Sequence, residues 1–152
     1  MVMLTPGDIA PVVALVDQDG VLFDWSLIRG ATTLVFFYPK ASTPGCTQQA
    51  CALRDIVPQI SSTRIIGVSP DKPAAQKRFA DKNGLAYPLL SDIDHVLAES
   101  YGVWKNKQLY GRQYMGIERS AFLIDASGVI AQAWYKISPK DTPIKLLAAL
   151  AE

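Results

Sequence analysis

The sequence predicts a single α/β domain with a central mixed sheet and helices on the faces of that sheet. Short apolar segments rich in β-branched and aromatic residues alternate with longer segments of helical periodicity. Two later apolar segments instead follow one another directly, which predicts a hairpin before a final helix. The chain has 152 residues, 49% of them hydrophobic, so we expect one domain spanning residues 1–152.

The first half of the chain should supply a hairpin and two strands of the sheet. Asp19-Gly20 lies between the apolar residues 12–16 and 21–23, which predicts an N-terminal β-hairpin. Residues 32–38, TTLVFFY, predict a buried strand that Pro39 ends. Residues 64–68, RIIGV, predict the next strand.

Two helices should follow these strands. Thr43 suits an N-cap and Pro44 suits the first helical position, so a helix should begin there and stop near Pro58. Asp71 and Pro73 should open a second helix, which Gly84 should close.

The second half should contain the remaining strands and two more helices. Leu89 and Leu90 predict a short strand, and residues 92–101 predict a short helix. Residues 120–124 and 129–135 predict the late hairpin, across Ala126-Ser127-Gly128. The final helix should begin near Asp141, with its inward face formed by Ile144, Leu147, Ala148 and Ala151.

Several residues between and beside these elements are predicted to have structural rather than catalytic roles. We expect Lys105 and Lys107 to lie in a solvated loop, and His95 to be an ordinary helix residue. The expected core or pocket-wall aromatics are Trp104, Tyr110 and Tyr114. Arg54 and Asp55 should form a local ion pair.

Composition excludes several classes of function. Fifteen Lys and Arg residues against fourteen Asp and Glu residues leave a net charge of +1, which favours neither nucleic acid nor an anionic membrane as partner. No apolar run approaches the roughly 18 residues of a spanning helix, and the N-terminus lacks a secretory pattern, so we expect a cytoplasmic protein. Two cysteines and one histidine fall short of a structural zinc site, so we expect no metal and no cofactor.

Cys46 is the first candidate for chemistry. It should occupy the third position of the helix that begins after Thr43, where unpaired N–H groups and the helix dipole favour an anion such as a thiolate. Gly45 leaves space beside the sulfur for a small substrate. The alternative is a buried, inert cysteine in a capped helix.

Cys51 follows five positions later on the same predicted helix. Five helical residues place the two Cα atoms about 8–9 Å apart, whereas a disulfide requires about 7 Å or less. Either this disulfide never forms, or the helix must unwind locally to form it. Cys51 could also be a small core residue.

The segment from Phe37 to Asp55, FYPKASTPGCTQQACALRD, resembles the active-site segment of peroxiredoxins, and more narrowly that of the peroxiredoxin Q, or bacterioferritin comigratory protein, group. The family's Pro-x-x-x-Thr-x-x-Cys pattern falls on Pro39, Thr43 and Cys46, and the narrower group's second cysteine falls on Cys51. Residues 116–125, GIERSAFLID, resemble the family strand that carries an active-site arginine, here Arg119.

This resemblance implies a thioredoxin-like fold and a specific reaction. Cys46 would reduce a hydroperoxide, hydrogen peroxide or an organic one, and become a sulfenic acid, with Thr43 and Arg119 as polar partners. Cys51 would resolve the sulfenic acid as a Cys46–Cys51 disulfide, which a thioredoxin-type reductant would reopen. The substrate pocket would include Pro39, Pro44, Gly45 and Gln49. The resemblance also implies a monomer.

Three positions depart from the family pattern, and two other functions stay open. Gln49, Ala41 and Ala121 stand where many relatives carry Glu, Asp and Thr. We expect only a polar contact from Gln49. We expect the protein to tolerate Ala41 and Ala121, because we place both outside the immediate surroundings of the Cys46 sulfur. One alternative is a thioredoxin-type oxidoreductase, whose Cys-x-x-Cys pattern is absent here. The other is a redox sensor or partner-binding domain, which would be oxidised once without turning peroxide over.

Overall fold

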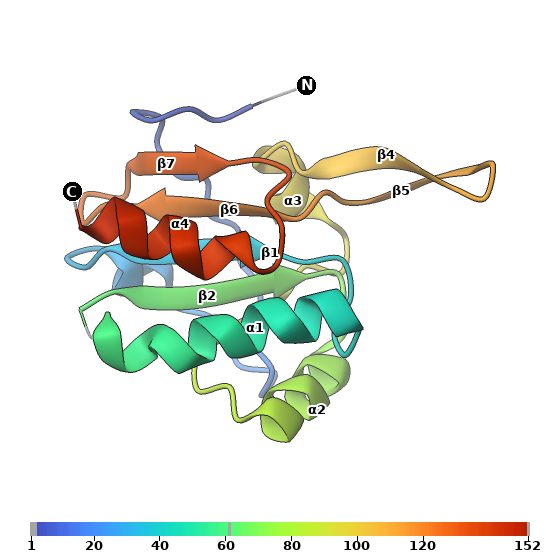
Figure 1. Ribbon diagram of the computed structural model, residues 1–152, viewed down its shortest axis with the longest axis horizontal. Helices are drawn as coiled ribbons and strands as arrows, with labels where there is room; N and C mark the ends of the chain where they lie inside the picture. Colours follow the sequence, from blue (N-terminus) through green and yellow to red (C-terminus); the bar gives the residue numbers. More distant parts are fainter. Residues whose placement is uncertain (1–2, 61, 152) are drawn as a thin grey trace.

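The computed structural model describes residues 3–60 and 62–151 of the chain. Its centre is a five-stranded mixed sheet in the order β3-β2-β1-β6-β7 (Figure 1). β1, β2 and β3 are parallel, whereas β6 runs antiparallel to both β1 and β7. The strand bounds are β1 (Thr33–Phe37), β2 (Arg64–Ser69), β3 (Leu89–Ser91), β6 (Ser120–Ile124) and β7 (Ile130–Trp134). The predicted mixed sheet with flanking helices is confirmed.

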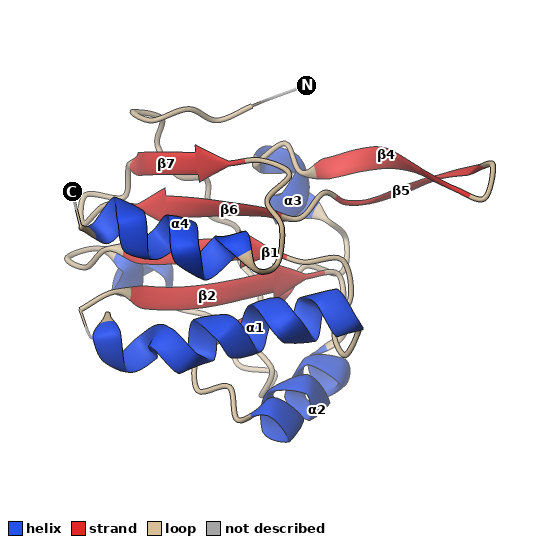
Figure 2. Cartoon of the chain, in the orientation of Figure 1, coloured by secondary structure: helices blue, strands red, loops and turns tan. Residues whose placement is uncertain are grey.

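Helices cover both faces of this sheet. Residues 3–60 and 62–151 contain the α-helices α1 (Pro44–Ile56), α2 (Pro73–Asn83), α3 (Val96–Ser100) and α4 (Asp141–Leu150), and the 3-10 helices η1 (Trp25–Ile28) and η2 (Val57–Gln59). α1 and α4 lie side by side in front of the strands in Figure 2. The helix predicted to follow Thr43 is confirmed, as is the second helix, which Gly84 closes with a left-handed φ of +61°.

The alternation of side chains along β1 divides the core into two clusters. Leu34, Phe36 and Tyr38 pack toward α1 and α4 in one cluster, and Val35 and Phe37 pack toward α3 and η1 in the other. All five side chains are fully buried. Because helices cover both faces, β1 is a continuous apolar run, and this is why residues 32–38 predict it so clearly.

The sequence does not predict the hairpin formed by β4 (Trp104–Leu109) and β5 (Arg112–Ile117). This hairpin extends away from the body of the molecule on the right of Figure 1. The prediction of a solvated loop at Lys105 and Lys107 is therefore wrong, because both residues lie in β4. The prediction of buried aromatics is wrong for Tyr110 and Tyr114, which are 97% and 45% exposed. Strands with little buried surface lack the apolar alternation that would reveal them.

Three further predictions are only partly correct. The N-terminal hairpin is reduced to an isolated bridge between Val16 and Leu22, around a turn that the Asp17 carboxylate stabilises through two backbone N–H groups. The helix predicted over residues 92–101 is limited to α3, and His95 lies at its N-cap with a positive φ of 50°. Asp92 accepts hydrogen bonds from the backbone of Leu97 and Ala98, so it orders this turn from outside the helix.

The final helix has the predicted start but a different inward face. Thr142, Pro143 and Leu146 are buried, whereas Ile144 is 62% exposed. Ala148 and Ala151 are also exposed, and only Leu147 of the predicted set packs against the core. This helix carries apolar residues on more than one face, so its sequence does not specify which face is buried. The packing against α1 determines that face. Within residues 3–60 and 62–151, no helix has the length and apolar character needed to cross a membrane.

Candidate active site

Cys46 lies in the first turn of α1, just beyond the carboxyl end of β1. It occupies the third helical position, as predicted, and its side chain is 1% exposed. The backbone N–H of Thr47 donates to the Thr43 carbonyl at 2.8 Å, so this first turn is fully formed. The sulfur is therefore held at a helix N-terminus, where backbone N–H groups stabilise a thiolate.

Arg119 meets Cys46 from the other side of the site. It directly precedes β6, whose first residue, Ser120, pairs with Phe37 at the end of β1. This antiparallel register brings Arg119 to the edge of the sheet where α1 begins. The Arg119 Nη2 atom lies 3.3 Å from the Cys46 Sγ atom, across 73 residues of sequence. A permanent positive charge at this distance favours the thiolate.

Gln49 continues this polar arrangement into the protein interior. Arg119 Nη1 donates to Gln49 Oε1 at 2.7 Å, and Gln49 Nε2 donates to Thr142 Oγ1 at 2.8 Å. The Thr142 hydroxyl in turn donates to the Ser138 carbonyl at 2.9 Å. Gln49 and Thr142 are fully buried. The guanidinium is thus oriented by a chain of hydrogen bonds that passes through Thr142 on α4 and ends at Ser138 in the preceding loop. Sequence analysis did not identify Thr142 or Ser138 as part of it.

Gly45 lies where Arg119 closely approaches α1. A Cβ atom at this position would lie 3.2 Å from Arg119 Nη2 and 3.6 Å from Pro139 Cγ. Such a contact is tight, and it would press on the guanidinium group that contacts Cys46. The glycine therefore makes room for the arginine, in addition to any space it leaves for a substrate.

Thr43 is the N-cap of α1, as predicted, but its side chain does not cap the helix. Its hydroxyl donates to the Lys40 carbonyl at 2.8 Å, which leaves the oxygen lone pairs as acceptors at the helix start. Pro44 is exposed and Pro39 is half-buried, so these two prolines frame the loop before α1. Within that loop Ser42 has a φ of +64°, a conformation uncommon for residues other than glycine.

A buried hydrogen-bond network anchors this loop to the sheet. The Asp71 carboxylate accepts from the Ala41 backbone N–H at 2.7 Å and from the Ser69 hydroxyl at 2.6 Å. Gln76 donates to the Ser69 oxygen, and its own carbonyl oxygen accepts from the Tyr38 hydroxyl. Burial raises the pKa of Tyr38, so this hydroxyl stays a neutral donor. Asp71 was expected to open α2, but Lys72 is the N-cap and Asp71 holds the loop instead.

Lys107 is close enough to influence the electrostatics of the site. Its Nζ atom donates to the Ile117 carbonyl at 2.7 Å, which ties β4 to the end of β5 just before Arg119. Burial lowers the pKa of Lys107, and the positive charge of Arg119 lowers it further. The base of the projecting hairpin therefore supports the segment that carries Arg119.

Cys51 lies on α1 and is half-buried, and both cysteines are free thiols. Its sulfur is 3.6 Å from the Asn83 side-chain oxygen at the end of α2. The residues between Cys46 and Cys51 are helical, so the structure holds the helical form that keeps the two sulfurs from bonding.

Other candidates have structural roles. Arg54 pairs with Asp55, as predicted, and also donates to the Asn83 carbonyl, so its contacts are with α2 rather than with Arg119. His95 stacks on the Trp104 ring at 3.9 Å, next to a helix that packs on the other face of the sheet from Cys46. Among residues 3–60 and 62–151, no three His, Cys, Asp or Glu side chains are grouped as metal ligands.

Residues 6–133 match the AhpC/TSA family. This chain belongs to that family. The chain is 49% identical over 129 residues to peroxiredoxin Bcp of Escherichia coli K12, covering 84% of this chain and 83% of the relative. It is therefore a peroxiredoxin-type enzyme, a thiol peroxidase.

Solved structures agree with this assignment. Peroxiredoxin Q of Xanthomonas campestris superposes with a TM-score of 0.87 at 35% identity, over 99% of this chain and 96% of that one. A PrxQ mutant of Xylella fastidiosa superposes with a TM-score of 0.90 at 28% identity, over 100% of this chain and 99% of that one. The predicted thioredoxin-like fold and the resemblance to the peroxiredoxin Q group are both confirmed.

Proposed function

We propose that Cys46 is the peroxide-reacting residue of this peroxidase. Its thiolate attacks the terminal oxygen of a hydroperoxide, the O–O bond breaks, and an alcohol or water leaves after taking up a proton. The sulfur is oxidised by two electrons to a sulfenic acid, and the peroxide is reduced by the same two electrons. The observation that carries this proposal is the 3.3 Å contact between Arg119 Nη2 and Cys46 Sγ at the start of α1.

Arg119 stabilises the charge that moves during this displacement. Negative charge spreads from the sulfur over both peroxide oxygens, and a fixed guanidinium beside the sulfur offers donors to each. The lone pairs of the Thr43 hydroxyl can accept the hydrogen of the peroxide, because its own hydrogen already goes to Lys40. Gln49 and Thr142 support Arg119 rather than the substrate, because both are fully buried and bonded to each other. Pro39, Pro44 and Gly45 line the approach.

Cys51 resolves the sulfenic acid. Its thiol attacks the Cys46 sulfur and a disulfide forms. The hydroxyl of the sulfenic acid combines with the thiol proton and leaves as water. Because α1 separates the two sulfurs, at least one turn must open before this step. A thioredoxin-type dithiol then reduces the disulfide in two exchange steps and returns both thiols.

Substrate range, compartment and assembly belong to the same proposal. The solved structure of bacterioferritin comigratory protein from Xanthomonas campestris, 34% identical to this chain, is described as informing alkyl peroxide reduction by that protein. We expect this chain to accept organic hydroperoxides as well as hydrogen peroxide. A dithiol reductant and two free thiols fit a reducing compartment, so we expect a cytoplasmic enzyme. From the resemblance to the peroxiredoxin Q group, we expect it to act as a monomer.

The test is peroxide consumption with a thioredoxin system, measured on the wild type, Cys46→Ser and Cys51→Ser. Turnover should be lost in Cys46→Ser. Cys51→Ser should consume one equivalent of peroxide and then stop with thioredoxin as reductant, while intact mass shows a stable sulfenic acid or its overoxidised form. Retention of most activity in Cys46→Ser would remove Cys46 from its role. Full turnover of Cys51→Ser without any disulfide in the wild type would make Cys51 a packing residue.

A further inference from the structure

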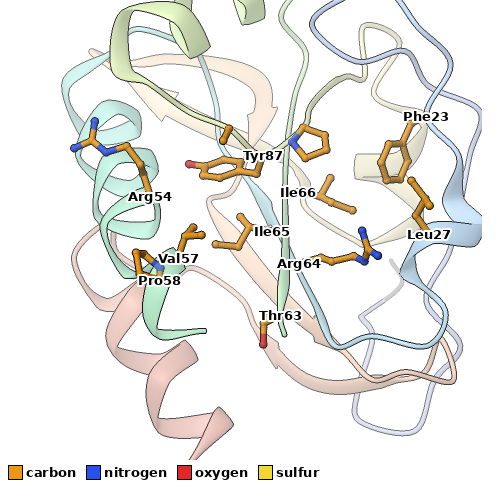
Figure 3. A pocket seen from close by; sticks show the side chains of 12 residues that line it. Phe23, Leu27, Arg54, Val57, Pro58, Thr63, Arg64, Ile65, Ile66 and Tyr87 are labelled. Carbon is orange, nitrogen blue, oxygen red and sulfur yellow. The ribbon is translucent and has the colours of Figure 1, made fainter. Parts of the chain in front are cut away.

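A cavity lies at the opposite end of α1 from Cys46. It encloses about 430 Å³ between the end of α1, η2, the start of β2 and the loop before β3 (Figure 3). This volume is within the roughly 300–1,000 Å³ of small-molecule pockets. Its walls are mainly apolar and include Phe23, Leu27, Val57, Pro58, Ile65 and Tyr87.

The charged residues that line the cavity are both arginines, and only one of them is available. The Arg54 guanidinium already contacts Asp55 and the Asn83 carbonyl, and it points away from the cavity in Figure 3. The Arg64 guanidinium lies across the cavity, on the side of Phe23 and Leu27. Among the described residues, Arg64 has no carboxylate or carbonyl partner for its side chain. An apolar cavity with one unpaired cation at its rim is complementary to an apolar molecule with one anionic group.

The edge of β2 adds backbone polar groups to this cavity. β3 pairs with β2 only from Gly67 to Ser69, so no strand lies beside the first half of β2 on that side. The Arg64 N–H donates to Thr32 on the β1 side, and the Gly67 N–H donates to Pro88 on the β3 side. Because these directions alternate along a strand, the polar groups of Ile65 face the unpaired edge. A ligand headgroup near Arg64 therefore also has a backbone donor within reach.

We propose that this cavity binds a small amphiphilic molecule, a free medium-chain fatty carboxylate. Its carboxylate pairs with Arg64, and its alkyl chain lies between Tyr87 and Leu27. The molecule is not held there as a substrate. Val57 is eleven residues after Cys46, so about 16 Å of helix separates the cavity from the reacting sulfur.

The cavity wall also belongs to the helix that carries both cysteines. Tyr87 lines the cavity, and its hydroxyl donates to the Ala50 carbonyl at 2.7 Å, next to Cys51. Val57 and Pro58 continue directly from α1. A ligand that contacts these residues binds the helical form better than an opened form, so occupancy slows formation of the Cys46–Cys51 disulfide. This effect rests on the proposed function, whereas the binding itself does not.

Binding is tested by calorimetry of the reduced wild-type protein with decanoate below its micelle concentration. We expect saturable binding of one equivalent. 1-Decanol and decyltrimethylammonium have the same chain without the anion, so each should bind at least about tenfold more weakly. Arg64→Gln should weaken decanoate to a similar degree, whereas Arg78→Gln, an exposed arginine on α2, should not change it. Equal binding of all three compounds, or no saturable decanoate binding, would overturn the proposal.

A second variant separates the cavity from nonspecific attraction to arginine. Ala86 lines the cavity and is exposed, so Ala86→Phe should fill the space while leaving the fold intact by circular dichroism. This variant should lose decanoate binding and keep peroxide turnover. Undiminished binding in Ala86→Phe would place the ligand elsewhere and refute the site.

The effect on the disulfide is measured by rapid mixing with one equivalent of peroxide, followed by acid quench and intact mass. Decanoate at ten times its dissociation constant should slow disulfide formation about tenfold in the wild type, and should have no effect in Ala86→Phe. The step that forms the sulfenic acid should keep its rate. Saturable binding without any change in the disulfide rate would disprove the coupling, and absence of any disulfide without ligand would instead disprove the resolving role of Cys51.

Discussion

At the scale of single residues, the candidate site depends on how one guanidinium group is held. Arg119 contacts Cys46 with one terminal nitrogen and Gln49 with the other. Its position is determined from three directions: by Gln49 from α1, by the space above Gly45, and by the register of β6 against β1. In the proposed reaction, a side chain fixed in this way would stabilise the thiolate without reorganising.

Replacing Arg119 tests this arrangement. Arg119→Ala should slow the second-order reaction with peroxide by about 10²-fold or more, because a main transition-state donor is lost. Arg119→Lys should recover only part of the rate, because a lysine cannot contact Cys46 and Gln49 with a planar fork. Stopped-flow oxidation of the reduced protein measures both variants. An Arg119→Ala rate equal to that of the wild type would exclude Arg119 from the reaction.

Gln49 should be required as an amide rather than as a carboxylate. The Thr142 hydroxyl gives its hydrogen to the Ser138 carbonyl, so it must accept from residue 49, and a carboxylate has no hydrogen to donate. Gln49→Glu would also place a negative charge beside Arg119, and this carboxylate would compete with the Cys46 thiolate for the guanidinium. We expect Gln49→Glu to slow the stopped-flow reaction of Cys46 with peroxide. Thr142→Val should react closer to the wild-type rate, because it adds no charge, and equal rates in all three proteins would contradict this role of Gln49.

At the scale of elements, the proposed reaction gives α1 two opposed purposes. The helical form buries Cys46 and holds it beside Arg119, but it also separates Cys46 from Cys51. The helix is 13 residues long, and its stability depends on burial of Ala50 and Leu53 rather than on its own propensity. Gly45 and Thr47 are poor helix formers, so the turn that we propose to open is the one with the weakest local preference.

Amide hydrogen exchange should detect this opening. The reduced protein should protect the backbone from residue 47 to residue 53, and the disulfide form should exchange faster there, because intrahelical hydrogen bonds are lost. Strands β1 and β6 should keep equal protection in both forms and serve as the internal control. Equal protection of residues 47–53 in the reduced protein and in the verified disulfide form would exclude the unwinding step.

At the scale of the whole molecule, the loop that presents Cys46 depends on segments far from it in sequence. Asp71 holds the Ala41 backbone and the Ser69 hydroxyl, and Gln76 joins Ser69 to Tyr38. These contacts connect the ends of β1 and β2 with α2, so the carboxyl edge of the sheet forms one bonded unit behind the site. The left-handed Ser42 lies in the same loop and is maintained by this anchoring.

Removing this anchor should change reactivity as well as stability. Asp71→Ala should lower the free energy of unfolding by about 1–3 kcal/mol and slow Cys46 oxidation, because the loop before α1 loses its tether. Asp125→Ala is a matched control, since Asp125, like Asp71, accepts two hydrogen bonds, here from two backbone N–H groups in the turn before β7. It should lower stability to a similar degree and leave the oxidation rate unchanged. Chemical denaturation and stopped-flow oxidation measure the two effects, and equal rates in both variants would show that the anchor does not act on Cys46.

Local pattern determines the elements whose signals are contained in a few neighbouring residues. The apolar run of β1, the Thr43–Pro44 start of α1 and the closing Gly84 are all predicted from sequence, and so is the third helical position of Cys46. These features depend on side-chain period, on proline geometry and on the freedom of glycine, which act over a few residues.

Contacts between distant segments are decided only by the tertiary structure. The resemblance to a family implies a role for Arg119 in the site. Thr142, in contrast, becomes a partner of Gln49 only through the packing of α4 on α1, and the apolar residues of α4 do not specify which of its faces makes that contact. The β4–β5 hairpin escapes prediction because its side chains are largely exposed and follow no apolar period. Sequence alone therefore determines where the Cys46 thiol lies on its helix. The packing of β6, α4 and α1 determines the charge and the hydrogen bonds that surround the thiol, because those groups are brought together only by burial of a shared core.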